Sequence, residues 1–246
     1  MRTTPIFVLL ALTLAGCAPK AAEVAGAGAT PKPGEAPAEK SFVVPEELKN
    51  DAYVYYGLGN TEEMTYEMVQ GKGMAPQEGT QTMRTKSGAK DGKMVFSTVR
   101  SGGMSGMGDE ELSLEKGGLY LTFGSIISPT EPSLVLPSKL DVGTTWKTDT
   151  TMTSNTANTT VKMKGTSKVE KSETIKVKAG TFDTLLIIQT AEADNNGAKG
   201  TMSAKGWYAK DVGIVKMNLE YKQADGQIVT TTLELVRKGK GAETSS

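Results

Sequence analysis

The chain has 246 residues, and its 28 Lys and Arg residues balance 28 Asp and Glu residues. A chain with balanced charge has no excess of basic residues with which to bind nucleic acid, so we expect no nucleic-acid partner. The sequence has no histidine and one cysteine, which excludes Ser-His and Cys-His nucleophile systems, the usual zinc ligand sets and an intramolecular disulfide.

The N-terminus predicts an export signal. Arg2 precedes an apolar run over residues 6–12, which is too short to span a bilayer as a permanent helix. The run ends at Leu14-Ala15-Gly16-Cys17, which resembles the lipobox that lipoprotein signal peptidase cleaves. We therefore expect residues 1–16 to be removed by cleavage between Gly16 and Cys17, and Cys17 to carry acyl chains such as palmitate. The alternative is an ordinary signal peptide with a chance cysteine.

The next segment has the composition of a tether. Residues 17–40 consist largely of Ala, Pro, Gly, Lys and Glu, which cannot form a core, so we expect a disordered linker behind the lipid. Ala18 stands where the known inner-membrane retention signal has an aspartate. That resemblance implies an anchor in the outer membrane, facing the periplasm. Residues 241–246 are expected to be a disordered tail.

Residues 41–240 are expected to form a single β-domain with little helix. Apolar and polar residues alternate in segments rich in Thr and β-branched side chains, which is typical of strands with one wet face. These segments are 64–68, 94–99, 119–123, 175–177, 214–219 and 228–236. Tight-turn sequences lie between such segments, at 91–92, 116–118, 195–197 and 225–226. Short connections of this kind predict an antiparallel meander.

Three motifs in the C-terminal half resemble a family of bacterial secreted proteins and lipoproteins. They are VGTTW at 142–146, AGTFDTL at 179–185 and WYAKDVGIVK at 207–216. The resemblance covers about residues 134 to 236. It implies a strongly curved antiparallel sheet, a half-barrel or open barrel similar to the lipoprotein-carrier factors of the periplasm. The family has no agreed activity that could be transferred.

The motif residues are interpreted as structural. Their glycines suit turn or bulge positions with special backbone angles: Gly143, Gly180 and Gly213. Their aromatic residues suit core anchors at strand starts: Trp146, Phe182 and Trp207.

The remaining polar residues predict no catalytic site, cofactor or metal centre. Ser113-Leu114-Glu115-Lys116 matches S-x-x-K, but it lies in an alternating strand rather than on a helix. Glu110 and Glu111 are adjacent, so they point to opposite faces of a strand and are interpreted as solvated charges. An enzyme would need convergent groups such as Tyr208, Lys210 and Asp211, which we interpret as a surface turn. We expect no enzymatic activity.

The 12 methionines are the unusual feature of the composition. Met104 and Met107 have the M-x-x-M spacing of soft-metal sites, but two thioethers without His or Cys make a weak site. Other methionines alternate with polar residues and are expected on the apolar face of the sheet. A curved sheet lined by Met64, Tyr66, Met68 and Met94 would offer an adaptable surface for acyl chains. The alternative is a dry core, filled by a helix or loop.

These observations predict a membrane-tethered lipoprotein of the cell envelope that binds an apolar, lipid-like ligand or a protein partner on a curved β-sheet. The alternative is a purely structural or protein-interaction lipoprotein without a ligand cavity.

Overall fold

The computed structural model describes residues 42–155 and 159–239, in which one antiparallel sheet contains every strand. The signal peptide and tether expected over 1–40 and the tail expected over 241–246 lie outside the described residues. The strands are β1 (Met64–Gln70), β2 (Gln77–Lys90), β3 (Lys93–Gly102), β4 (Glu110–Glu115), β5 (Gly118–Gly124), β6 (Ile127–Pro129), β7 (Ser133–Pro137), β8 (Thr145–Ser154), β9 (Thr160–Val177), β10 (Gly180–Asn195), β11 (Ala198–Ala209), β12 (Gly213–Lys222) and β13 (Ile228–Lys238).

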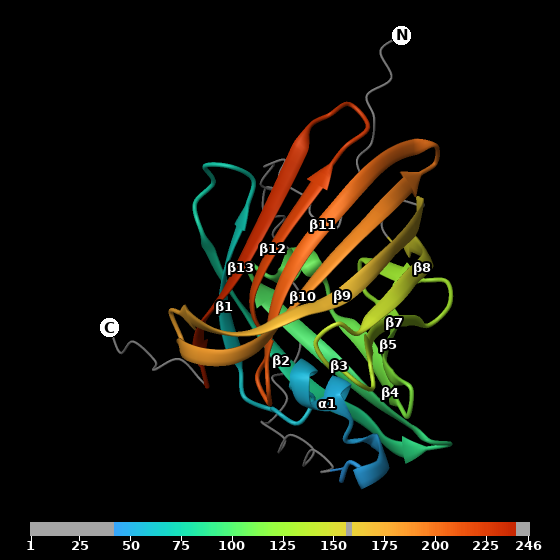
Figure 1. Cartoon of the computed structure of the whole chain (residues 1–246), viewed down its shortest axis with the longest axis vertical. Coiled ribbons are helices and arrows are strands. Elements are labelled where there is room, and N and C mark those ends of the chain that lie inside the picture. The colour runs from blue at the N-terminus through green and yellow to red at the C-terminus, as the bar shows by residue number, and fades with distance from the viewer. Residues whose placement is uncertain (1–41, 156–158, 240–246) are drawn as a thin grey trace, which may run out of the picture.

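The sheet curls into a nearly closed barrel with one unsealed seam (Figure 1). Its strand order is β6-β8-β9-β10-β11-β12-β13-β1-β2-β3-β4-β5-β7, so chain neighbours are mostly sheet neighbours. The first strand of the chain pairs with the last, β1 with β13, and Met68 lies opposite Leu233. The expected all-β, strongly curved antiparallel meander is thereby confirmed.

The seam lies where the first and last strands of that order approach each other. Side chains bridge it near one end, where Ser128 Oγ donates to Gly124 O over 2.7 Å and Asn155 Nδ2 donates to the same carbonyl over 2.7 Å. Within the described part of the chain no strand ladder joins β7 to β8. The barrel is therefore closed by side chains at one point rather than by continuous backbone pairing.

A short helix enters the barrel before the first strand. A 3-10 turn, η1 (Glu46–Leu48), leads into α1 (Asp51–Tyr56). The helix ends at Gly57, which has a φ of 71°. A Cβ at that position would lie 2.7 Å from the carbonyl carbon of Val212, because the helix end packs against the β11–β12 turn. Glycine is required here by both the backbone angle and the close approach.

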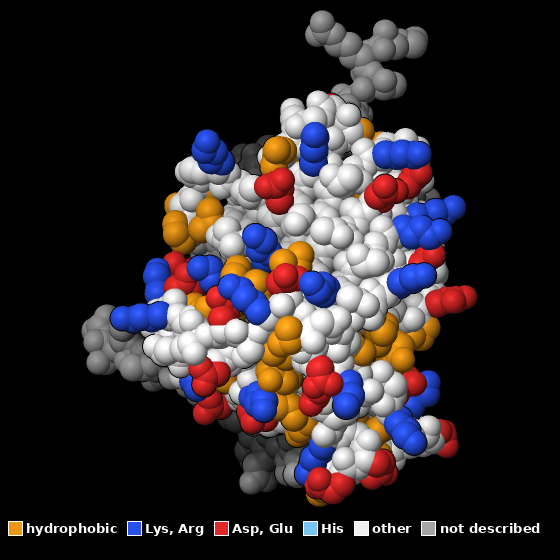
Figure 2. Space-filling model, in the orientation of Figure 1, with side chains coloured by type: hydrophobic (Ala, Val, Ile, Leu, Met, Phe, Trp, Pro, Cys, Tyr) orange, Lys and Arg blue, Asp and Glu red, His pale blue; other side chains and the backbone are white. Residues whose placement is uncertain are grey.

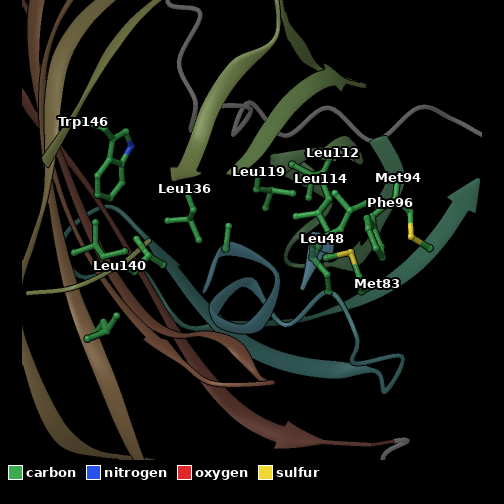
Figure 3. Packing of buried hydrophobic residues seen from close by; sticks show 14 of the residues in the cluster. Leu48, Met83, Met94, Phe96, Leu112, Leu114, Leu119, Leu136, Leu140 and Trp146 are labelled. Carbon is green, nitrogen blue, oxygen red and sulfur yellow. The ribbon is translucent and has the colours of Figure 1, made fainter. Parts of the chain in front are cut away.

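The helix fills one half of the barrel. Leu48, Ala52 and Leu58 are buried in one cluster with inward-facing residues of several strands. In Figure 3, Leu48, Met83 and Phe96 converge with the leucines of β4 and β5, while Trp146 lies apart from them. This half of the barrel is a packed core.

Asn50 connects α1 to the sheet through two hydrogen bonds, so its replacement should destabilise the packing of α1 inside the barrel. Its Oδ1 accepts from Tyr53 N over 3.2 Å, and its Nδ2 donates to Glu115 O over 3.1 Å. Asn50→Ala should lower the free energy of unfolding by about 1–2 kcal/mol, since it removes a helix cap and leaves a carbonyl unpaired. Urea unfolding followed by circular dichroism measures this. Asn50→Asp keeps the cap acceptor and should recover part of the loss, whereas equal losses in both variants would contradict the assignment.

Candidate functional site

The half of the barrel that α1 leaves unfilled contains a cavity of about 320 Å³. We call it the barrel cavity. Its wall is formed by residues of every strand except β2 and β3, and Met83, Met94 and Phe96 of these two strands belong to the packed half. Ile127 and Val135, from the two sides of the seam, both line it. The structure thus lies between the two sequence-based alternatives, because the interior is neither fully open nor fully filled.

Methionine is the most frequent residue type in the wall of the barrel cavity. Six methionines line it: Met68, Met107, Met152, Met163, Met202 and Met217. Leu, Ile, Val and Trp146 supply most of the remaining apolar surface. Thioether side chains are unbranched and adapt to ligands of different shapes. Such a wall can adapt to apolar ligands of different shapes.

The four residues expected on an apolar ligand face lie in different parts of the barrel interior. Of the four residues expected to face an apolar ligand, the structure places Met68 on the cavity wall. Met68 is also 3% exposed and belongs, with Met64 and Tyr66, to a second apolar cluster that includes Val215 and Leu235. Met94 lies in the cluster around α1, and Met64, Tyr66 and Met94 do not line the cavity. The alternation that predicted an inward face is correct for them. Which part of the inner face stays open depends on α1 and η2 (Ser105–Met107), and alternation carries no information about that.

The M-x-x-M loop is part of the barrel interior. Met104 is 1% exposed in the second apolar cluster, and Met107 lines the barrel cavity. Among residues 42–155 and 159–239, no three His, Cys, Asp or Glu side chains are grouped so as to hold a metal ion.

A buried ion pair lies beside the barrel cavity. The side chain of Arg100 is 5% exposed, and its Nη2 donates to Glu110 Oε2 over 2.7 Å. Its Nε donates to Gln81 Oε1 over 2.9 Å and its Nη1 to Gly108 O over 2.6 Å. Glu110 itself lines the cavity. Glu110 was interpreted as a solvated charge, and its side chain is still 25% exposed, but it faces inward and pairs with Arg100, whereas Glu111 pairs with Lys86 on the other face.

Three tyrosines surround this ion pair and resist ionisation. Burial, and after it the negative charge of Glu110, raises the pKa of Tyr56 well above its usual value and that of Tyr208 to about 12. Burial also raises the pKa of Tyr66, whose hydroxyl donates to Ile214 O over 3.0 Å. All three phenols are therefore neutral in the folded protein at any physiological pH.

These pKa shifts predict loss of stability in alkali. An unfolded tyrosine releases its proton near pH 10, while the folded phenols hold theirs. Stability should therefore be complete below about pH 10 and fall toward pH 12, by about 1.4 kcal/mol per pH unit for each tyrosine that titrates only when unfolded. Urea midpoints between pH 8 and pH 11.5 measure the slope. Tyr208→Phe should make it shallower by one tyrosine's share, and an unchanged slope would contradict the shift.

The glycines of the three motifs have positive φ angles, and the aromatic residues differ in how far they are buried. Gly143, Gly180 and Gly213 have φ values of 95°, 138° and 93°. Trp146 is buried and lines the barrel cavity. Trp207 is partly buried and packs against the second apolar cluster. Its Nε1 donates to Glu173 Oε1 over 2.9 Å.

Phe182 lies in a similar position. It is partly buried in the second apolar cluster, and Lys238 Nζ lies 5.5 Å from the centre of its ring.

Two groups of residues are possible catalytic sites by sequence, and the structure does not bring the side chains of either group together. Ser113 Oγ donates to Glu115 Oε1 over 3.1 Å, within strand β4. Tyr208 lines the barrel cavity, whereas Lys210 Nζ lies 5.7 Å from the ring of Tyr55 and Asp211 occupies a turn with a φ of 59°. Within the described residues, no hydrogen bond joins Ser113 to Lys116, or Tyr208 to Lys210 or Asp211.

The outer face of β9 to β13 carries mixed charge. Figure 2 shows Lys and Arg side chains interspersed with Asp and Glu on this side, with hydrophobic side chains between them. One such contact is Lys178 Nζ, which donates to both carboxylate oxygens of Glu67 over 2.6 Å. In the described part of the chain, no helix is long and apolar enough to cross a membrane.

Comparison with known proteins supports the fold. A family model described as DUF3108-like matches residues 124–233, the C-terminal part of the barrel and the seam. A candidate lipoprotein from Parabacteroides distasonis superposes with a TM-score of 0.52 at 13% identity, over 75% of this chain and 98% of that one.

Two further solved structures have lower TM-scores. An exported protein with YmcC-like fold from Bacteroides fragilis gives 0.49 at 11% identity, over 74% of this chain and 96% of that one. The hypothetical lipoprotein YmcC from Escherichia coli gives 0.35 at 9% identity, over 79% and 91%. No protein with a curated function matches. At such identities the superposition with the Parabacteroides protein shows a shared fold and nothing finer.

Proposed function

We propose that the protein is a lipid-anchored lipoprotein of the cell envelope whose β-domain binds an apolar, lipid-like ligand without catalysing a reaction. The barrel cavity carries this proposal. An engineered cavity of about 150 Å³ in another protein binds benzene, so twice that volume accommodates about twelve carbon atoms. A packed barrel with no ligand would have no reason to leave 320 Å³ lined by six thioethers, since unfilled apolar volume destabilises a fold.

Binding can be tested with a neutral fluorescent dye. The full chain with Cys17→Ser has no acylation site, so no attached lipid competes for the cavity. N-phenyl-1-naphthylamine should bind this protein with one site per chain, and its fluorescence should increase in the apolar surroundings. Native mass spectrometry of the same protein should show added masses of small apolar molecules. The absence of both signals would overturn the proposal.

The anchor rests on Leu14-Ala15-Gly16-Cys17. It is supported by the candidate lipoprotein whose fold this chain shares. Radiolabelled palmitate should be incorporated into the wild-type chain but not into Cys17→Ser. Ala18 favours the outer membrane, facing the periplasm. Fractionation should then place the labelled protein in that membrane and not in the inner one.

A second candidate function is protein interaction through the seam. The edge strands β6 and β7 each have a ladder partner on one side only within the described residues. An extended segment of a partner could pair with such an edge. The sequence-based version of this alternative has no ligand cavity. The volume inside the barrel argues against that version. The alternative becomes the better account only if the dye does not bind.

A further inference from the structure

The barrel cavity contains one polar group that the protein leaves without a partner. Thr231 of β13 is 4% exposed and lines the cavity. Its Oγ1 is one of three buried side-chain N or O atoms in the described residues for which no hydrogen-bond partner is found. Leaving a buried hydroxyl unpaired costs about 1–3 kcal/mol. Val at this position would avoid that cost. The wall also carries the polar side chains of Gln70, Glu110, Ser133, Thr148, Thr150, Ser167 and Gln189, but none of their atoms is among the buried ones without a partner.

Gln70 places a second polar group beside this hydroxyl. The two residues are directly opposite each other in the β1–β13 ladder, and both line the barrel cavity. The bond that the structure shows for the Gln70 amide is a long one, from Nε2 to Met68 Sδ over 3.9 Å. A thioether is a weak acceptor, so most of the hydrogen-bonding capacity of this amide is available to a ligand. Hydroxyl and amide together can both donate and accept.

The charge of the wall restricts the ligand further. Glu110 is the charged residue among those that line the barrel cavity in the described part of the chain, and no Lys or Arg is among them. The carboxylate of Glu110 is already balanced by Arg100. A buried carboxylate or phosphate of a ligand would therefore have no cation to pair with. An ammonium group of a ligand would have only the Glu110 carboxylate to pair with, and Arg100 already compensates that charge.

From the unpartnered Thr231 hydroxyl, the neighbouring Gln70 amide and the lack of a free charge, we infer that the barrel cavity selects neutral amphiphiles. The ligand is a single chain of about twelve carbons, by volume, with one hydroxyl or amide group that bonds Thr231 and Gln70. The methionines surround its apolar part. This inference rests on the proposed function and names the ligand class of that same site.

A matched ligand series tests the charge requirement. 1-Decanol, decanoate and decylammonium share one chain and differ in the charge of the head group. Each is used to displace N-phenyl-1-naphthylamine from the Cys17→Ser protein at pH 7.5. We expect decanol to compete at a concentration at least about 10-fold lower than either ion, because burying an unpaired charge is costly. Equal or better competition by decanoate or decylammonium would overturn the inference while leaving the proposed function intact.

A matched pair of variants tests the hydrogen bond. Thr231→Val removes the hydroxyl at nearly constant volume, and Thr232→Val makes the same change on the exposed face of the same strand. Thr231→Val should weaken decanol binding about 2- to 10-fold, the usual range for one hydrogen bond, and leave binding of 1-chlorodecane unchanged. Thr232→Val should change neither. Thr231→Val should also keep or raise the melting temperature, which separates lost binding from unfolding. Equal decanol affinity in both variants would contradict the role of Thr231.

If the dye binds to none of these proteins, the proposed function fails and the inference fails with it. If the dye binds but decanol shows no preference over decanoate, only the inference fails.

Discussion

Arg100→Met should lower the free energy of unfolding by about 3–5 kcal/mol, the usual cost of removing one partner of a buried ion pair. Arg100 satisfies Gln81, Gly108 and Glu110 from inside the barrel, and its own side chain is 5% exposed. Without it the Gln81 and Gly108 oxygens lose their donor, and the Glu110 carboxylate, whose side chain is 25% exposed, loses its counter-charge. Urea unfolding at pH 7, followed by circular dichroism, measures the change.

Two further variants distinguish this cost from the general effect of losing an arginine. Arg100→Met combined with Glu110→Gln should recover part of the loss, because no uncompensated charge remains. Arg237→Met breaks an exposed pair, in which Arg237 Nη2 lies 2.8 Å from Glu78 Oε2, with side chains 49% and 53% exposed. It should cost less than about 1 kcal/mol. Similar losses for Arg100→Met and Arg237→Met would contradict the buried role of Arg100.

Ala204→Phe should abolish ligand binding, with at least about a 100-fold loss of affinity for N-phenyl-1-naphthylamine, a free-energy difference of about 2.7 kcal/mol. Ala204 lies on β11 and lines the barrel cavity, between Met202 and Gly206 on the same inner face. A phenyl ring at this position would occupy the space that the ligand needs. The cavity provides room for it, so the fold should be retained.

The control for Ala204→Phe is the adjacent position. Lys205 is exposed on the outer face of β11, so Lys205→Phe adds the same ring outside the barrel. It should leave the affinity for the dye unchanged. Circular dichroism spectra of both variants should match that of the parent protein. If Ala204→Phe binds the dye as well as Lys205→Phe does, the dye is not inside the barrel.

The sheet could be predicted because its signals are local. Alternation of apolar and polar residues determines which segments are strands and which side chains share a face. Turn sequences such as Asn196-Gly197, which joins β10 to β11, and Asp91-Gly92, which joins β2 to β3, predict that chain neighbours pair. A meander needs little more, since most of its strand contacts are between consecutive strands. The long-range closure of β1 on β13 had no such signal.

Helix α1 was missed although its ends carry ordinary helix signals. Asn50 is a favoured N-cap residue and Gly57 a favoured C-cap residue. The six residues between them are too few for a helical period to be seen. This omission matters for the site, because α1 determines which half of the barrel is filled.

The polar interior was missed for a different reason. Arg100 stands four residues after Phe96, so alternation places it on the same inward face. Charged side chains are usually exposed, and Glu110 was interpreted as a solvated charge on that basis. The two charges are compatible with burial only as a pair, and their pairing depends on the register of β3 with β4, in which Thr98 is opposite Glu110. Sequence alone does not give that register.

The location of the ligand can be tested most directly with a heavy-atom analogue. Crystals of the Cys17→Ser protein grown with 10-bromo-1-decanol should show one anomalous bromine peak inside the barrel, among methionines such as Met163, Met202 and Met217. The hydroxyl end should lie beside Thr231. A bromine peak on the outer surface, or none in a crystal whose protein is otherwise well ordered, would contradict a ligand-binding barrel.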